Sequence, residues 1–264
     1  MKKLILILLI SFNSYAVDVK TYIPTAANQY LPTVKQEQIL NWKDHPIPAQ
    51  LPALIEHESC ISLTHSRCWS PTSKLKTQRE EGAGLGQITR AYTIDGKLRF
   101  DALEEIKNKH VSLNEFTWEN VYSRPDLQIR AVILKSKDNY NTLSVVTNPV
   151  ERLQFSDAAY NGGLGGVQNE RRACQLKSGC NPQVWKDNVE MVCLKSKKPL
   201  YGNRSACDIN RYHVVDVTKT RTQKYVPFMV DKVEIQKKVE QEIKIVKEKS
   251  ILNICIEFIM KFFK

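Results

Sequence analysis

The sequence lacks several features, and each absence argues against one class of protein. No hydrophobic run reaches the roughly 20 residues that a membrane-spanning helix needs, so no spanning helix is expected. Gly-x-Ser-x-Gly does not occur, which argues against a serine hydrolase built on a nucleophile elbow. RNP, zinc-finger and basic-zipper patterns are missing, as are internal repeats and low-complexity tracts. Nucleic-acid-binding modules and repeat architectures are therefore disfavoured.

The start of the chain is typical of a secretory signal peptide. Lys2 and Lys3 precede an apolar stretch from Leu4 to Ile10, and Ser14-Tyr15-Ala16 puts small residues at the −3 and −1 positions of a cleavage site. We expect removal of residues 1–16, the alternative being an uncleaved amphipathic start. The mature protein is then exported, to the periplasm or cell envelope.

The charge balance is strongly basic. Loss of Lys2 and Lys3 takes the formal net charge from +11 to +9. Such a field favours an anionic partner: a cell-wall polymer, a membrane surface or a nucleic acid. Export and the missing motifs make nucleic acid the least favoured of the three.

Seven cysteines in an exported chain of this length predict disulfides. The pairs that lie close in sequence are Cys60/Cys68, Cys174/Cys180 and Cys193/Cys207, and Cys255 is left over. Sequence alone does not set the connectivity. A zinc site on Cys60, His65 and Cys68 is the alternative, although no fourth ligand lies nearby. We expect no metal and no cofactor.

Composition divides the mature chain into three parts. Residues 17–50 contain four prolines among polar residues and predict a mostly irregular lead-in. Helical periodicity dominates residues 51–215, the expected catalytic domain. Residues 216–264 form a basic tail, in which positions 219–264 carry 11 Lys/Arg against 6 Asp/Glu. The tail predicts an amphipathic helix that binds a membrane surface or partner helix, or else packs on the domain.

Two glutamates lie two positions apart in the apolar run of residues 51–63. Numbered at 100° per residue from Leu51, Glu58 falls at about 340°, within the apolar stripe, and Glu56 at about 140°, on the solvent side. Burial penalises an ionised carboxyl group and raises its pKa, so Glu58 is predicted to hold a proton near neutral pH. A general acid that protonates a glycosidic oxygen needs this property. The alternative is a structural Glu58 that pairs with an arginine or caps a helix.

Two further stretches bear on Glu58. Residues 84–88 read Gly-Leu-Gly-Gln-Ile and predict a turn feeding a short strand. Residues 159–163 read Ala-Tyr-Asn-Gly-Gly, which is typical of a helix that ends at a glycine. Together with Glu58-Ser59, these segments resemble, in order, the Glu-Ser, Gly-Leu-Met-Gln-Ile and Tyr-Asn-x-Gly signatures of the soluble lytic transglycosylases, a branch of the lysozyme-like superfamily. The resemblance covers roughly residues 50–190.

The resemblance implies an α+β, lysozyme-like fold: a mostly helical catalytic domain with a small β element, here followed by the C-terminal amphipathic helix. It also implies a peptidoglycan lytic transglycosylase. Glu58 would protonate the oxygen between N-acetylmuramic acid and N-acetylglucosamine, then accept the proton of the muramyl 6-hydroxyl as the 1,6-anhydro ring closes. By similarity, Gln87 contacts the sugar, Tyr160 places its hydroxyl within hydrogen-bond reach of the acid, Asn161 has a structural or sugar-contacting role, and Ser59 orients the cleft.

Departures from the family pattern leave other readings open. Gly86 stands where the family has Met, which predicts a wider space beside the sugar. Glu80 and Glu81 precede the second signature, and either one, facing Glu58 across a water, would make the protein a hydrolase of the muramidase type. Glu81 is also a candidate substrate-binding residue. A third reading is a non-catalytic wall-binding component of an envelope-spanning machine.

The five histidines receive no catalytic role at this level, because none stands in a recognisable triad order with a nucleophile. His57, at about 240° on the same helical wheel, is expected to be a partly exposed neighbour of the apolar stripe. A cysteine nucleophile would need a free thiol, which export disfavours.

Overall fold

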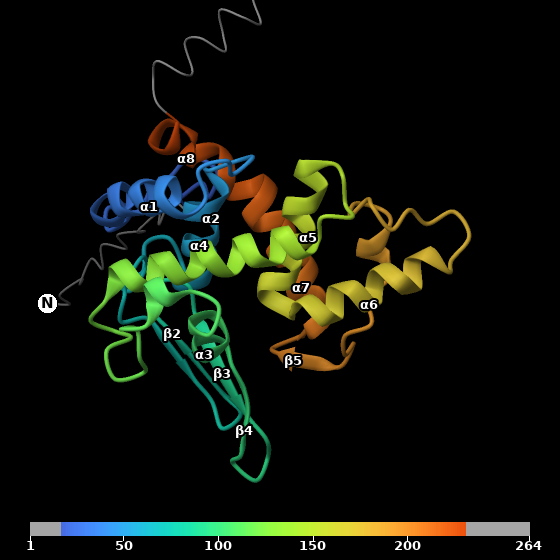
Figure 1. The fold of residues 1–264 in the computed structure, drawn as a ribbon, viewed down its shortest axis with the longest axis horizontal. Helices are drawn as coiled ribbons and strands as arrows, with labels where there is room; N and C mark the ends of the chain where they lie inside the picture. Colours follow the sequence, from blue (N-terminus) through green and yellow to red (C-terminus); the bar gives the residue numbers. More distant parts are fainter. Residues whose placement is uncertain (1–16, 231–264) are drawn as a thin grey trace, which may run out of the picture.

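The protein has an α+β architecture with a small antiparallel sheet (Figure 1). The structure is a computed structural model and describes residues 17–230, so the predicted signal peptide, the tail from residue 231 and Cys255 lie outside the described residues. The helices are α1 (Ala27–Asn41), α2 (Gln50–Ser59), α3 (Ala102–Lys107), α4 (Pro125–Thr142), α5 (Pro149–Gly162), α6 (Leu164–Gln175), α7 (Ala206–Val215) and α8 (Thr222–Met229). Short 3-10 turns lie at η1 (Val111–Leu113) and η2 (Val189–Met191), and a π-helical segment at η3 (Asp216–Arg221).

The strands form two antiparallel sheets. They are β1 (Lys74–Lys76), β2 (Glu80–Ala83), β3 (Ile88–Tyr92) and β4 (Leu98–Asp101) in the larger sheet, and β5 (Pro199–Tyr201) and β6 (Arg204–Ser205) in a separate hairpin. The order of the larger sheet is β1-β2-β3-β4, so each strand pairs with its neighbour in the chain. Figure 1 shows this sheet projecting away from the helices beneath α4.

The turn between β2 and β3 confirms the prediction of a small β element at residues 84–88. Gly84 has a φ of 71°, a region that residues with a Cβ rarely adopt. A Cβ there would also lie 2.3 Å from the side chain of Gln128, whose Oε1 accepts a hydrogen bond from Leu85 N at 2.8 Å. Only glycine lets α4 hold the turn this closely.

Helix α4 runs through the middle of the molecule, with α1, α2 and α8 on one side of it (Figure 1). Residues 17–50 are therefore not the irregular lead-in that their prolines predicted. Ala27, Leu31 and Val34 recur at helical spacing and are buried in the main core. Pro32 lies inside α1, where it removes one backbone donor, and burial of the apolar stripe outweighs that loss.

The helical domain also continues past residue 215, where the basic tail was predicted to begin. Segments η3 and α8 pack against α2, and Val217, Tyr225 and Met229 are buried with it in one core cluster. Residues 216–229 therefore pack on the domain, which was the second of the two alternatives predicted for the tail. Nothing in the described residues bears on its remainder.

Three disulfides join Cys60–Cys68, Cys174–Cys180 and Cys193–Cys207, the pairs that lie close in sequence, and settle a connectivity that the sequence left open. Because Cys60 and Cys68 are bonded to each other, they are not available as zinc ligands, and that alternative is wrong. Three disulfides indicate an oxidising compartment of the kind that exported proteins reach. None of the helices within residues 17–230 is long and apolar enough to cross a membrane.

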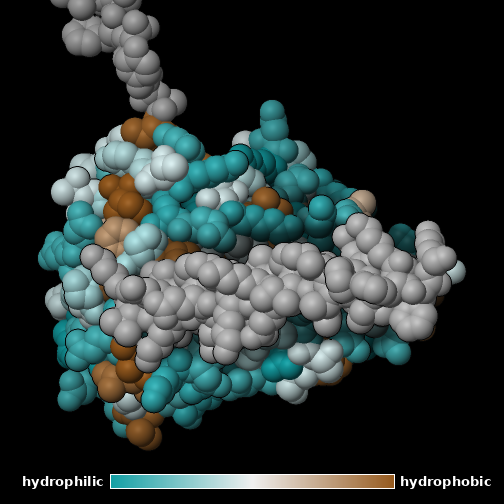
Figure 2. All heavy atoms as spheres, turned by 90° about the horizontal axis from the view of Figure 1, so that it is seen from above, coloured by the Kyte–Doolittle hydropathy of each residue, from teal (hydrophilic) through white to brown (hydrophobic). Residues whose placement is uncertain are grey.

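Figure 2 views the molecule from above and shows a mostly hydrophilic coloured surface, with apolar side chains gathered in small groups chiefly along the left edge. Several exposed apolar residues lie singly on the surface, among them Ile94 and Leu176. Single exposed apolar residues are ordinary on folded proteins. The feature that calls for a functional explanation is instead a large recess.

Candidate active site

A cavity of about 990 Å³ lies between the helical body and the larger sheet. Its wall is built from the ends of α2 and α5, one side of α4, strands β1 to β4 with α3, strand β5, and the first turn of α7. The volume is at the upper end of the range that ligand pockets occupy. Glu58, Gln87, Tyr160 and Asn161, which come from three separate sequence signatures, all line it.

Glu58 lies in the last turn of α2 with its side chain 15% exposed. Its Oε1 is 2.9 Å from Nε2 of His213. Burial acts to raise the pKa of Glu58, but the hydrogen bond from His213 and the charges of His213, His57 and Lys135 together hold this pKa below its ordinary value. The prediction of a raised pKa was therefore wrong. The helical wheel placed Glu58 toward the protein but could not include the cations that α4 and α7 bring to it.

Glu56 is fully buried, so its predicted place on the solvent side of the helix was wrong. Arg221 Nη1 lies 2.8 Å and Lys224 Nζ 2.6 Å from its Oε1, and the hydroxyl of Tyr225 donates to its Oε2 at 2.5 Å. All three partners come from the segment after α7, which covers the face of α2 that would otherwise meet water. Glu56 therefore joins two parts of the fold, and it does not line the cavity.

Tyr160 lies in the last turn of α5 and is 7% exposed. Its hydroxyl donates to Gly86 O at 2.8 Å rather than to Glu58, contrary to the expected contact. Burial raises the pKa of Tyr160 well above its ordinary value, and the charges of Glu58 and Asp157 add to the shift. The Tyr160 ring therefore lies near Glu58, and its hydroxyl joins the end of α5 to the β2–β3 turn.

Gly86 does not widen the cavity as expected from the missing side chain. A Cβ at this position would lie 2.1 Å from Val132 Cγ2 and 2.8 Å from the Tyr160 hydroxyl, so it would point into packed protein. Glycine here allows α4 and α5 to approach the turn closely and allows the hydrogen bond from Tyr160.

The polar groups of Ser59 and Gln87 are partly engaged by the protein itself. Ser59 donates to Ile55 O in its own helix at 2.7 Å and is 2% exposed. Gln87 has a φ of 42° and donates from Nε2 to Gly84 O at 2.9 Å. These bonds stabilise the end of α2 and the β2–β3 turn, and both residues line the cavity.

Asn161 lies on the cavity wall just before the end of α5, and its Oδ1 accepts a hydrogen bond from Asn210 Nδ2 at 3.0 Å. Helix α5 ends at Gly162, and the following Gly163 has a φ of 82°, so the predicted glycine stop is confirmed. The contact with Asn210 links the third signature to α7.

Glu80 and Glu81 point to opposite faces of β2, as neighbours on a strand must. Glu81 is bound by Arg90 at 2.8 Å and Lys74 at 3.3 Å and does not line the cavity, which contradicts its predicted role in substrate binding. Burial acts to raise its pKa, but the two cations hold the pKa of Glu81 below its ordinary value. Glu80 is on the cavity side, where it accepts a hydrogen bond from the Tyr201 hydroxyl.

His213 and Asp157 belong to the site but were not singled out from the sequence. His213 Nδ1 lies 2.8 Å from Asp157 Oδ2, and its Nε2 faces Glu58. Asp157 precedes Tyr160 by one helical turn, so its shared face with the third signature was available as a sequence signal. Nothing local distinguishes His213 of α7, because its partners Asp157 and Glu58 lie far away in the chain. His57, 18% exposed, is the partly exposed neighbour that was predicted.

Cations predominate on the cavity wall. Arg67, Lys74, Arg99, Lys109, Lys135 and Lys195 line it, against the four acids Glu58, Glu80, Glu105 and Asp138. Lys135 Nζ donates to Tyr160 O at 2.7 Å, and burial lowers the pKa of Lys135 to about 8. Lys74 and Lys195 are bound to Glu81 and Glu170, which do not line the cavity, so the excess of cations is partly neutralised. The remaining cations can bind an anionic ligand.

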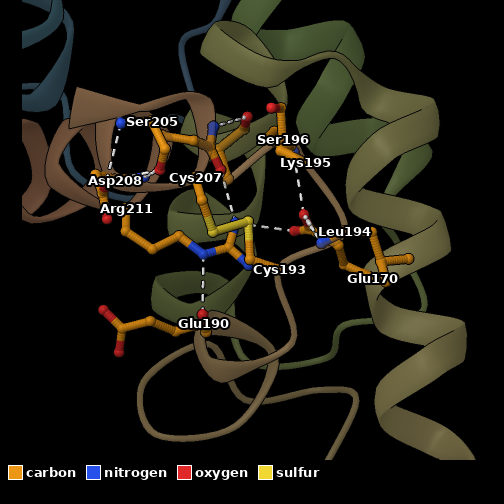
Figure 3. Close-up of a disulfide and its surroundings, with 12 residues drawn as sticks. Glu170, Glu190, Cys193, Leu194, Lys195, Ser196, Ser205, Cys207, Asp208 and Arg211 are labelled. Carbon is orange, nitrogen blue, oxygen red and sulfur yellow. Dashed lines mark hydrogen bonds and ion pairs between the residues drawn. A yellow bond between two sulfur atoms is a disulfide. The ribbon is translucent and has the colours of Figure 1, made fainter. Parts of the chain in front are cut away.

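The β5–β6 hairpin is fastened beside the cavity by the Cys193–Cys207 disulfide (Figure 3). Next to the disulfide, the buried Glu170 of α6 binds Lys195 at 3.2 Å and Arg211 of α7 at 2.9 Å. The hairpin itself contributes Leu200 and Tyr201 to the cavity wall. The disulfide and the ion pairs therefore fix one wall of the cavity to α6 and α7.

Within residues 17–230, no three or more His, Cys, Asp or Glu side chains are placed to hold a metal ion. No protein-family profile matches the chain, and no curated protein matches it.

Proposed function

We propose that the protein is a peptidoglycan lytic transglycosylase with a lysozyme-like catalytic domain. It cleaves the β-1,4 bond between N-acetylmuramic acid and N-acetylglucosamine in the periplasm or cell envelope and needs no cofactor. One observation carries the proposal: Glu58, Gln87, Tyr160 and Asn161 come from three distant signatures and meet on the wall of one cavity. The cations of the cavity wall support it, because the stem-peptide carboxylates of peptidoglycan are anionic.

Glu58 performs both proton transfers in this reaction. Protonation of the glycosidic oxygen breaks its bond to the muramyl C1, where an oxocarbenium-like charge develops. The ionised Glu58 then takes the proton of the 6-hydroxyl as that oxygen bonds to C1. In the substrate-free site the lowered pKa of Glu58 leaves the carboxyl ionised at neutral pH, so the first step draws its proton from a neighbouring group.

A muramidase is the second candidate, favoured by the place of Glu80 on the cavity side of β2. An inverting or retaining hydrolase uses two carboxyl groups on opposite sides of the bond. Glu81, held by Lys74 and Arg90, is no longer a candidate for this role.

Mass spectrometry of muropeptides released from purified sacculi tests the proposal. The mature protein is expected to release 1,6-anhydro-muropeptides. Reducing muramyl ends would instead identify a hydrolase, and a protein that binds sacculi without releasing fragments would be a wall-binding component. Glu80→Gln separates the first two further, since it abolishes cleavage only in a hydrolase that uses Glu80.

A further inference from the structure

We infer that His213, held by Asp157, is a positioning residue that orients Glu58 and stores the proton that Glu58 delivers to the glycosidic oxygen. This inference rests on the proposed function. The three side chains stand in line from three helices, with Asp157 Oδ2 2.8 Å from Nδ1 and Glu58 Oε1 2.9 Å from Nε2 of the same ring.

The geometry determines how many protons the line holds. An ionised carboxylate only accepts hydrogen bonds, so each ring nitrogen facing one must carry a proton, unless the carboxyl group carries it instead. Two contacts therefore hold two protons. One stays between His213 and Asp157, and the other lies between His213 and Glu58. The second proton is the one that Glu58 needs as an acid.

Because these side chains are buried, the His213 ring has to keep its proton. His213 is 1% exposed and the Asp157 side chain is fully buried, so neither exchanges freely with water. Asp157 Oδ1 has no hydrogen-bond partner within the described chain, so the His213 ring is the cation hydrogen-bonded to Asp157, and the charge of Lys135 acts on it from nearby. A buried carboxylate without a counterion is strongly destabilising. The Asp157 charge therefore keeps His213 protonated.

Other titratable groups lie near this line of three side chains. Lys135 of α4 and Tyr160 of α5 lie near Glu58, and His57 of α2 stacks edge-on against His213 with 4.3 Å between the ring centroids. Asp216 of η3 binds His57 at 2.6 Å. Burial lowers the pKa of His213, but the charges of Asp157 and Glu58 and their hydrogen bonds outweigh it and raise this pKa to about 10.

The proton balance of one turnover closes within the site. His213 Nε2 gives its proton to the Glu58 carboxyl group, which passes it to the glycosidic oxygen as the bond from that oxygen to C1 breaks. The neutral His213 ring keeps the proton on Nδ1, which it donates in a hydrogen bond to Asp157. When the 6-hydroxyl oxygen bonds to C1, its proton goes to Glu58 and back to Nε2. No external acid or base is consumed.

The pH profile of sacculus cleavage tests the inference in the mature protein. Asp157→Asn removes the charge that keeps His213 protonated, so the alkaline limb of kcat/KM is expected to move down by about one pH unit or more. His213→Gln is expected to lower kcat about 100-fold with KM nearly unchanged. His45→Gln is the control, because His45 is a buried histidine that accepts a hydrogen bond from Ile47 N at 3.0 Å and does not line the cavity.

A spectroscopic measurement covers the case in which a variant does not fold. Nitrogen-15 shifts of the wild-type histidine rings, with His213 assigned by its absence in His213→Gln or by through-space contacts, are expected to show both nitrogens protonated at pH 8. A neutral His213 ring at pH 8, or an unshifted alkaline limb in folded Asp157→Asn, overturns the inference while wild-type cleavage leaves the proposed function standing. Wild-type protein that releases no muropeptides at any pH overturns both.

Discussion

Arg221 Nη1 lies 2.8 Å from Glu56 Oε1 and joins α2 to the segment that follows α7. Glu58, one half-turn further along the same helix, faces the cavity and His213 instead. Two glutamates of similar sequence context thus do different work, because different distant segments cover the two sides of α2. Substitutions at the two positions are expected to fail in different ways.

Glu58→Gln is expected to lower wall cleavage by about 100-fold or more, since an amide cannot supply the proton. The melting temperature should stay within a few degrees of wild type. Turbidity loss of purified sacculi, followed beside circular dichroism, measures both. Cleavage at wild-type rate by the folded variant would remove Glu58 from the reaction.

Glu56→Gln is expected to lower stability and to leave the cleavage activity of the folded protein unchanged. It leaves Arg221 and Lys224 buried beside a neutral amide, and breaking one partner of a buried ion pair costs about 3 kcal/mol or more. Urea unfolding measures this loss. The fraction that remains folded should still cleave sacculi, and a variant as stable as wild type would show that the Glu56 contacts do not hold the C-terminal segment.

Gly86→Ala is expected to destabilise the protein by about 1–3 kcal/mol and to lower activity, because the new methyl group collides with Val132 and displaces the Tyr160 hydroxyl. Gly165→Ala is the matched control. Gly165 lies in α6 with open space around its Cβ position, so alanine there should leave stability unchanged or raise it slightly. Equal effects of the two substitutions on thermal unfolding would refute the tight contact at Gly86.

Stability is expected to fall as the pH rises from about 6.5 to about 8. The pKa of His213 is about 10 in the folded state against an ordinary 6.5, so between these values the folded state binds more protons than the unfolded state. The stability that this proton binding contributes is complete below about 6.5 and decreases as the pH rises above it. Above about 8 the lowered pKa of Lys135 acts in the opposite direction, which limits the clear test to this window. Urea unfolding at several pH values gives the slope, and His213→Gln should flatten it.

Loss of the Cys193–Cys207 disulfide, through a double serine variant, is expected to cost about 3 kcal/mol and to lower cleavage, because this bond fastens the β5–β6 hairpin to α7. The Cys174–Cys180 disulfide closes a shorter loop away from the cavity lining, so its loss should cost about 2 kcal/mol and leave cleavage of the folded protein unchanged. Equal loss of cleavage in both variants would contradict a specific role for the hairpin.

Local chemistry was enough to predict part of this structure. The Gly84 turn and the glycine stop after α5 each depend on residues close together in the chain, whereas the α+β class was an implication of the family resemblance. The predictions of an irregular lead-in and of a tail beginning at residue 216 were wrong, because the structure of these segments depends on residues far away in the chain. Prolines and charges mark a segment as polar, but α1 and α8 are helices because the apolar residues among them find a core supplied by distant segments.

The sequence by itself predicted four side chains that line the candidate site: the acid at position 58 and the glutamine, tyrosine and asparagine of the later signatures. Only the tertiary structure decided their charge and partners. In the folded protein, η3 and α8 bury Glu56, and Glu81 forms ion pairs away from the cavity. His213 lies between Asp157 and Glu58. The reason is that electrostatic energies depend on distance through space and on burial, and neither follows from separation along the chain.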